Sequence, residues 1–228
     1  YYFMGKDNIP FHTIIWPAML MGYGGLNLPY DVPANEYLNL EGLKFSTSRD
    51  WAVWLPDYLD RYEADALRYV VSANMPETSD SDFSWREYVR SNNDELVATY
   101  GNLVHRVLTM THRYFDRRVP EPGPLDPLSA GLLDDAARRF SETGANIEAC
   151  RFRAALGSGM ALAQAANRYI EQRAPWRAIK DSREDAATTL WTALCVVNCL
   201  KMAFYPFLPF SSEKLHGMLG FAGSVKDQ

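Results

Sequence analysis

The stretch SWREYVRSNNDELVATYGNLVHRVLTMTHRYF, residues 84–115, decides the fold class of this chain. Its pattern is helical and predicts a helix over residues 85–116. Two more helical patterns follow, over residues 127–173 with a break near Gly144 and over residues 184–208. The Pro- and Gly-rich segment VPEPGPLDP separates the first two. Three long helices in succession predict a helical bundle.

The preceding part of the chain has a different pattern, in which strand and helix signals alternate. Residues 2–4 predict a buried parallel strand, and a helix is predicted within PFHTIIWPAMLMGYG. The segment VPANEYLNLEGLKFS alternates and turns at NLEG, as a β-hairpin does. After residue 50 the strand signals end: DWAVWLPDYLDRY and ADALRYVVSAN predict short amphipathic helices, and MPETSDSDF predicts a linker. We therefore expect a mainly α fold, with a remnant of an α/β sheet before the helical bundle.

The composition fits an ordinary soluble globular protein. The 228 residues are 47% apolar and 22% charged, and the formal net charge is -5. This charge argues against a generally basic nucleic-acid binder, so any contact with nucleic acid has to be local. The most apolar stretch, WTALCVVNCLKMAFYPFLPF, contains Lys201 and two prolines, and we expect a buried helix followed by a turn rather than a membrane span.

The three cysteines, Cys150, Cys195 and Cys199, are an odd number, and reduced thiols in a cytoplasm are the simplest account. Cys195 and Cys199 lie one helical turn apart. We interpret them as thiols on a core face, with a shared metal ion as the alternative.

The stretch KFSTS, residues 44–48, is a candidate phosphate-binding loop. It combines short hydroxyl side chains with two cations, Lys44 at its start and Arg49 directly after it. Together with backbone N–H groups in a turn, these groups can stabilise charge that develops on a pyrophosphate leaving group. A plain solvated connector is the alternative interpretation.

Asp7 follows the first predicted strand, at the kind of sheet edge where ligands bind in open α/β folds. Its carboxylate can accept hydrogen bonds from a ribose hydroxyl or an ammonium group, or it can simply begin the next helix. On that helix His12 and Trp16 lie four residues apart and project from one face, near Phe11. They are candidates to line a pocket for an apolar side chain, and a histidine beside a tryptophan in the core is the alternative.

Asn102 and Arg106 also lie four residues apart, within GNLVHR. An amide beside a guanidinium suits hydrogen bonding to the edge of an unpaired base. Trp176 follows a predicted helix end at Ala174 and Pro175, where its indole is available for stacking. A solvated helix face and a core tryptophan are the alternatives.

Together these motifs resemble the methionyl-tRNA synthetases, a family of class I aminoacyl-tRNA synthetases. FMGKDNIPFHTIIWPAML is similar to the family's segment after its connective insertion, and KFSTS stands where most members have the signature loop KMSKS. NNDELVATYGNLVHRVL and NRYIEQRAPW resemble the anticodon-binding bundle, so the resemblance covers nearly the whole chain. It implies the end of a Rossmann-like catalytic domain over residues 1–54, stem-contact helices over 55–84 and a helical anticodon-binding domain over 85–228.

The resemblance also implies a function. The family activates methionine with ATP to methionyl-adenylate and transfers the methionyl group to tRNA(Met), so the implied partners are methionine, ATP with Mg²⁺ and this tRNA, in the cytoplasm and without a membrane. Zinc is implied only in the upstream insertion. The implied site residues are Asp7 and Lys44 for ATP; Phe11, His12 and Trp16 for methionine; Lys44, Ser46, Thr47 and Ser48 in the signature loop; and Asn102, Arg106 and Trp176 for the CAU anticodon.

Two departures from the family pattern matter. Thr47 stands where the signature has its second lysine, so charge for pyrophosphate has to come from Lys44 or Arg49, and arginine is not geometrically equivalent to lysine. The family's other signature, HIGH, is absent, and the first residues, YYFMGKD, resemble a strand from the middle of a sheet. We therefore expect the C-terminal portion of a longer synthetase, inactive alone. The alternatives are a tRNA-binding fragment without catalysis and a paralogue that joins amino acids in small-molecule biosynthesis.

Overall fold

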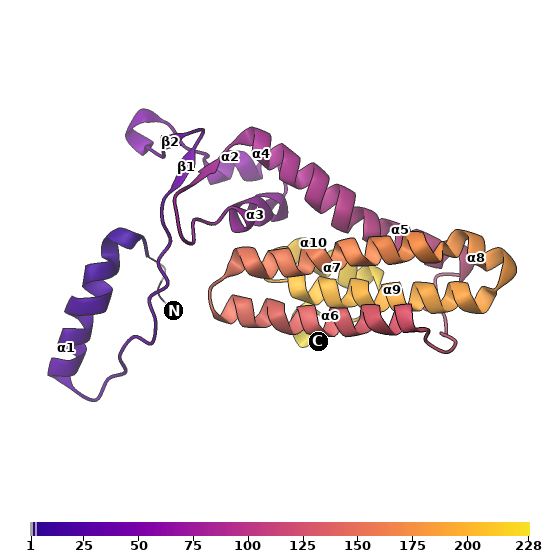
Figure 1. Ribbon diagram of the computed structural model, residues 1–228. Coiled ribbons are helices and arrows are strands. Elements are labelled where there is room, and N and C mark those ends of the chain that lie inside the picture. The colour runs from indigo at the N-terminus through magenta and orange to yellow at the C-terminus, as the bar shows by residue number, and fades with distance from the viewer. Residues whose placement is uncertain (1, 3) are drawn as a thin grey trace. The chain divides into compact units, whose positions relative to one another are not determined.

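The computed structural model describes residue 2 and residues 4–228 (Figure 1). They form two compact units, which we call the sheet unit and the helical unit. The sheet unit comprises the described residues up to 53 together with 74–84, and the helical unit comprises 54–73 and 85–228. The segment 55–84, predicted to join two domains, is therefore divided between the units. The predicted mainly α fold with a small sheet is confirmed.

A three-stranded sheet with the strand order β2, β1, β3 lies in the sheet unit. β1 and β2 form the predicted hairpin, with Leu40 opposite Leu43 in an antiparallel pair. Glu41 and Gly42 make its turn, and both have positive φ angles, 49° and 76°, as a type I′ turn requires. The strands are β1 (Leu38–Leu40), β2 (Leu43–Lys44) and β3 (Ser81–Phe83).

β3 lies in the segment that was predicted to be a linker, so the prediction that strands end at residue 50 is wrong. It pairs parallel with β1, with Leu38 opposite Ser81. Because serine and aspartate have low strand propensity, pairing with β1 rather than local preference makes this strand. The strand predicted over residues 2–4 includes Phe3, which lies outside the described residues; Tyr2 and Met4 belong to no strand.

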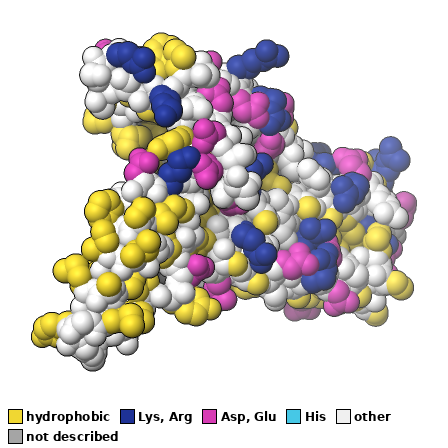
Figure 2. Space-filling model, turned by 60° about the vertical axis from the view of Figure 1, so that its left-hand side comes forward, with side chains coloured by type: hydrophobic (Ala, Val, Ile, Leu, Met, Phe, Trp, Pro, Cys, Tyr) yellow, Lys and Arg dark blue, Asp and Glu magenta, His cyan; other side chains and the backbone are white. Residues whose placement is uncertain are grey.

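The predicted helix near the N-terminal end is confirmed as η2 continued by α1, but none of its residues is buried. The apolar stripe of Phe11, Ile15 and Met19 is 56%, 48% and 67% exposed. Hydrophobic side chains gather over this helix on the face shown in Figure 2. The helical segments of the sheet unit are η1 (Lys6–Asn8), η2 (Phe11–Ile15), α1 (Trp16–Tyr23) and η3 (Thr47–Arg49).

Three long helices of the helical unit, α6, α7 and α9, pack side by side (Figure 1). The two short amphipathic helices predicted after residue 50 are confirmed as α2 and α3. The Asp65 carboxylate on α3 accepts a hydrogen bond of 2.6 Å from the Ser211 N–H, in the first turn of α10. The helices are α2 (Leu55–Leu59), α3 (Ala64–Ala73), α4 (Trp85–Arg90), η4 (Ser91–Gly101), α5 (Asn102–Tyr114), α6 (Pro127–Glu148), α7 (Phe152–Arg173), α8 (Pro175–Asp181), α9 (Arg183–Phe204), α10 (Pro209–Met218) and η5 (Val225–Asp227).

The first long predicted helix is confirmed, since α4, η4 and α5 run without interruption to Tyr114. The second is two helices, and the break is not near Gly144, which lies within α6. It falls between Glu148 and Phe152, where Cys150 has a φ angle of 54° and reverses the chain. The third ends at Phe204, earlier than predicted, and α10 follows as a separate helix.

α9 is the central helix of the core, and the prediction of a buried helix here is confirmed. Leu190, Val197 and Leu200 on this helix have no exposed surface. Among the described residues, α9 alone is long and apolar enough to cross a membrane by length and composition, but 72% of its apolar window is buried inside the protein. Its apolar character is therefore explained by packing against the other helices.

Candidate functional site

Asp7 lies in η1 of the sheet unit and is hydrogen-bonded to a residue that the sequence did not single out. The Tyr37 hydroxyl contacts both oxygens of the Asp7 carboxylate, at 2.9 and 3.0 Å. This hydrogen bond is the main reason that the pKa of the Tyr37 hydroxyl is raised above its ordinary value. Asp7 therefore does not merely begin a helix, since its carboxylate is held by a side chain thirty positions away.

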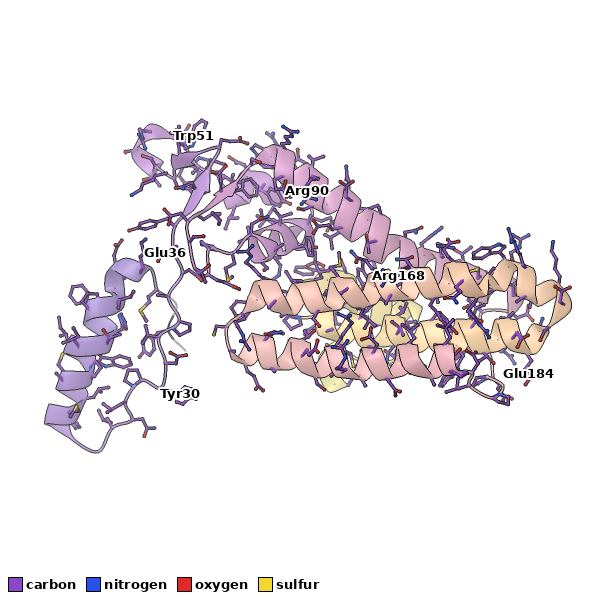
Figure 3. All side chains as sticks on the ribbon, viewed as in Figure 1. Tyr30, Glu36, Trp51, Arg90, Arg168 and Glu184 are labelled. Carbon is purple, nitrogen blue, oxygen red and sulfur yellow. The ribbon has the colours of Figure 1, made fainter. Side chains whose placement is uncertain are left out.

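Two ammonium groups lie over the ring of Tyr37. Lys6 Nζ is 4.1 Å from the ring centroid, and Lys44 Nζ is 4.8 Å from it. Lys6 also forms ion pairs with Glu36, labelled in Figure 3, and with Asp80. The hydrogen bond to Glu36 raises the pKa of the Lys6 ammonium. The structure thus brings Asp7 and Lys44 together, as the phosphate-loop interpretation requires, and Tyr37 connects them.

The loop that follows Lys44 is closed at its base and open at its tip. Ser46 and Trp51 exchange two backbone hydrogen bonds of 2.9 Å, and the Trp51 indole N–H donates to the Leu40 carbonyl at 2.9 Å. The hydroxyls of Ser46 and Ser48 lie 3.2 Å apart. Thr47, Ser48 and Arg49 are exposed. The fixed base and exposed hydroxyl and guanidinium groups suit a loop that meets phosphate oxygens.

His12 and Trp16 lie on one face of the first helix, as their spacing predicts. Their rings are 5.9 Å apart and nearly perpendicular, and the ring of Tyr2 lies 5.1 Å from Trp16. His12 Nδ1 is 3.0 Å from the Asn8 carbonyl, which can only accept, so this nitrogen carries a proton. Phe11, also predicted for this pocket, has an exposed side chain. The result is an aromatic surface with one polar nitrogen.

In the helical unit, three helices bring Arg106 and Trp176 together. Arg106 on α5 lies 5.4 Å above the Trp176 ring, and its Nη2 is 2.7 Å from Glu171 Oε1 on α7. Trp176 is on α8, which begins at Pro175 after Ala174 in a left-handed conformation. The predicted helix end is confirmed, and Trp176 is only partly buried. The guanidinium is therefore held between an indole face and a carboxylate.

A groove of about 730 Å³ lies beside this pair and is lined mainly by polar and charged residues. Asn102 and Arg106 both line it, which confirms that they share a helix face. Asn167 on α7 donates from Nδ2 to the carbonyls of Thr99 and Ala163, at 3.0 and 3.1 Å. Its Oδ1 is buried and has no hydrogen-bond partner among the described residues. The lining side chains from α7 are Gln164, Asn167, Arg168, Glu171 and Gln172.

This face of α7 was not predicted from the sequence. Asn167 and Arg168 each lie three or four residues from both Gln164 and Glu171, which is the spacing of one helix face. A search for polar as well as apolar helical periodicity finds them. Arg168, labelled in Figure 3, adds a second cation to the groove beside Arg106.

The cysteines lie away from these sites and behave as packing groups. Cys195 and Cys199 are half-buried on α9, and burial raises the pKa of the Cys199 thiol to about 11. Its Sγ lies 3.7 Å from the Ala136 carbonyl. Within the part of the chain that the structure describes, no cluster of three or more His, Cys, Asp or Glu side chains is placed to hold a metal ion.

Two family models match consecutive parts of the chain. A model described as tRNA synthetases class I (M) matches residues 1–108, and the anticodon binding domain of methionyl tRNA ligase matches residues 119–226. The first contains Asp7, Tyr37 and Lys44, and the second contains Trp176. This chain belongs to the methionyl-tRNA synthetase family.

Relatives and solved structures within the methionyl-tRNA synthetase family are similar over nearly the whole chain. The methionine–tRNA ligase of Roseiflexus castenholzii is 55% identical over 228 residues, 100% of this chain and 38% of its own. That of Dehalococcoides mccartyi strain 195 is 58% identical over 226 residues, 99% of this chain and 41% of its own. Mycobacterium tuberculosis methionyl-tRNA synthetase in complex with methionyl-adenylate has a TM-score of 0.89 at 30% identity, over 96% of this chain and 43% of that one. The chain therefore spans well under half the length of the synthetases it matches.

Proposed function

We propose that this chain forms part of a cytoplasmic methionyl-tRNA synthetase, which activates L-methionine with ATP and transfers the methionyl group to tRNA(Met). Within it, the helical unit recognises the CAU anticodon. The observation that carries this proposal is the position of Arg106 between Glu171 and Trp176, beside Asn102, in a member of this family. Residues 1–54, 55–84 and 85–228 are the proposed catalytic, stem-contact and anticodon-binding parts.

Anticodon recognition needs stacking and hydrogen bonding to unpaired bases. The partly buried Trp176 offers an indole face for one base, and stacking of this kind contributes about 1–3 kcal/mol per base. The Glu171 carboxylate fixes the direction of the Arg106 guanidinium, whose remaining N–H groups can donate to acceptors on a base edge. The amide of Asn102 offers both a donor and an acceptor. This combination favours single-stranded loop RNA over a duplex, whose base edges are less accessible.

In the first reaction step, an oxygen of the methionine carboxylate attacks the α-phosphorus of ATP, and the bond to pyrophosphate breaks. No side chain acts as a nucleophile. Lys44, with the hydroxyls of Ser46 and Ser48, stabilises negative charge on the leaving pyrophosphate, and Asp7 binds the adenosine or the substrate ammonium group. Thr47 contributes a hydroxyl without charge, and the exposed Arg49 is the second cation of the loop.

The substrates fit the groups that are present. ATP enters as its Mg²⁺ complex, and the exposed Lys44 and Arg49 complement its remaining phosphate charge. Phe11, His12 and Trp16 border the methionine side chain, for which an aromatic surface is suitable because sulfur contacts with aromatic rings are favourable. The zinc of the family remains an expectation for the insertion, which is outside this chain.

The proposal is tested by binding of an anticodon stem-loop RNA to the 228-residue chain, measured by fluorescence anisotropy. We expect binding of the CAU loop and weaker binding when the anticodon is changed. Trp176→Ala should weaken binding of the CAU loop about 10-fold, which corresponds to the lower half of the stacking range. Phe210→Ala, at a 64% exposed aromatic residue, is the matched control and should bind as the unsubstituted chain does.

Equal binding of all anticodons, or CAU binding unaffected by Trp176→Ala, would contradict anticodon recognition. Either result would favour the alternative function, a paralogue that joins amino acids in small-molecule biosynthesis. That enzyme has no need of Asn102, Arg106 and Trp176.

A further inference from the structure

The backbone of Tyr37 is held through both its N–H group and its carbonyl by residues at the start of β3. Its N–H donates to Asp80 Oδ1 at 2.9 Å, and its carbonyl accepts from the Ser81 N–H at 3.0 Å. Asp80 directly precedes β3, and Ser81 begins it. Because Ser81 is also paired with Leu38 in the parallel ladder, Tyr37 cannot shift without breaking the sheet.

The side chain of Tyr37 extends from this fixed point to both halves of the candidate adenylation site. Its hydroxyl contacts both oxygens of Asp7, which restricts rotation of that carboxylate. Lys44 is opposite Asn39 in the hairpin, so Tyr37, two residues before Asn39, lies on the same sheet face and diagonal to Lys44. The short distance between the Lys44 ammonium and the ring follows from this register.

We propose that Tyr37 is a positioning residue of the adenylation reaction, in which its hydroxyl orients the Asp7 carboxylate and its ring holds the Lys44 ammonium beside it. This role rests on the proposed function. An exposed cation–π contact contributes about 0.5–1 kcal/mol, which is enough to bias the position of a flexible lysine. A phosphate group attracts the ammonium more strongly, so Lys44 moves from the ring to ATP at little cost.

Tyr37 is not needed to hold the surrounding segments together. Lys6 already connects them through its ion pairs with Glu36 and Asp80, and the Glu36 N–H donates to the Pro76 carbonyl at 2.7 Å. These contacts do not involve the Tyr37 side chain. A substitution of that side chain should therefore alter kinetics more than stability.

The test uses methionine-dependent ATP–pyrophosphate exchange by the complete synthetase that contains this chain. Tyr37→Phe keeps the ring and removes the hydroxyl, and should raise the KM for methionine and ATP about 10-fold with little change in kcat, because a hydrogen bond to a binding carboxylate is lost. Tyr37→Leu also removes the ring, and should lower kcat by a further factor of about 3, because Lys44 is no longer held. Tyr30→Phe makes the same change at a fully exposed tyrosine of the same unit and should leave both constants unchanged.

The outcomes separate the two proposals. Unchanged KM and kcat in both Tyr37 variants overturn the positioning role, and so do equal losses in both variants together with a lower Tm, since these indicate a structural role only. A complete enzyme that shows no exchange before any substitution instead refutes the proposed function. A rise in KM for Tyr37→Phe and a further fall in kcat for Tyr37→Leu, at constant Tm, support the positioning role.

Discussion

The two units differ in how completely each buries its own apolar side chains. In the helical unit, buried residues continue along α6, α7 and α9, and many of them on α9 have no exposed surface. In the sheet unit, the buried residues among those described are Leu40, Pro76 and Phe83. The sheet unit is held largely by hydrogen bonds and ion pairs around β1 and β3, and the helical unit by a continuous core.

This difference shows which part of the chain carries its own stability. A helix with apolar residues on every face is typical of a helix covered on every side, yet none of the residues of α1 is buried. The relatives of the chain are more than twice as long as the part that it matches. Regions with few buried apolar contacts open locally at low free energy, whereas a complete core opens only with the whole unit.

The largest expected effect comes from removing core volume in the helical unit. Leu200→Ala, at a residue with no exposed surface, should lower the free energy of unfolding by about 2–5 kcal/mol. The same change at Leu28, which is 51% exposed in the sheet unit, should alter it by no more than about 0.5 kcal/mol. Urea titrations followed by far-UV circular dichroism measure both. Effects of similar size would mean that the sheet unit has a core of its own.

A smaller effect is expected where two helices of the core approach most closely. A Cβ added at Gly159 on α7 would lie 2.6 Å from a ring carbon of Phe204 on α9. Because Phe204 is buried, Gly159→Ala should cost about 1–3 kcal/mol. Gly157→Ala, on the same helix and in open space, is the matched control and should raise stability slightly, by up to about 1 kcal/mol. A Gly159→Ala variant as stable as Gly157→Ala would show that the core is loosely packed there.

The helices were predictable because their signal is local. Apolar residues at helical spacing mark α4, α5 and α9, and Pro175 marks the start of α8. The breaks were less predictable: Gly144 continues a helix, whereas Cys150 adopts the left-handed conformation that glycine favours. The sequence of a short turn does not show how the following helix packs back on the preceding one.

The candidate site was predictable in its residues but not in its connections. Asp7 and Lys44 were both expected, yet Tyr37 between them was not, because its role depends on β3. That strand pairs across more than forty residues, and its three residues, SDF, are too few to give a strand pattern. Likewise, the role of Glu171 depends on the packing of α5 against α7, which brings its carboxylate to Arg106. The sequence alone does not show this packing.

The smallest effect tests a surface feature of the helical unit against its core. Asp126 caps α6: its carboxylate accepts from the N–H groups of Leu128 and Ser129, and it pairs with Arg173 at 2.9 Å. Burial raises the pKa of this carboxyl, but the hydrogen bonds from Ser129 and the charge of Arg173 outweigh it, so the pKa lies below its ordinary value of 3.8. A lowered carboxyl pKa stabilises the folded state above pH 3.8, and this contribution is lost as the pH falls through the folded pKa.

Asp126→Ala should therefore cost about 1 kcal/mol at pH 7, the usual value of a helix N-cap, and less below pH 3.8. Chemical unfolding at both pH values measures the difference, and Asp134→Ala, at an exposed residue of the same helix, is the control. A cost at pH 7 as large as that of Leu200→Ala would contradict the conclusion that a continuous core holds the helical unit, because a surface cap would then matter as much as the core. A cost that stays constant as the pH falls would mean that the carboxylate charge is not what stabilises α6.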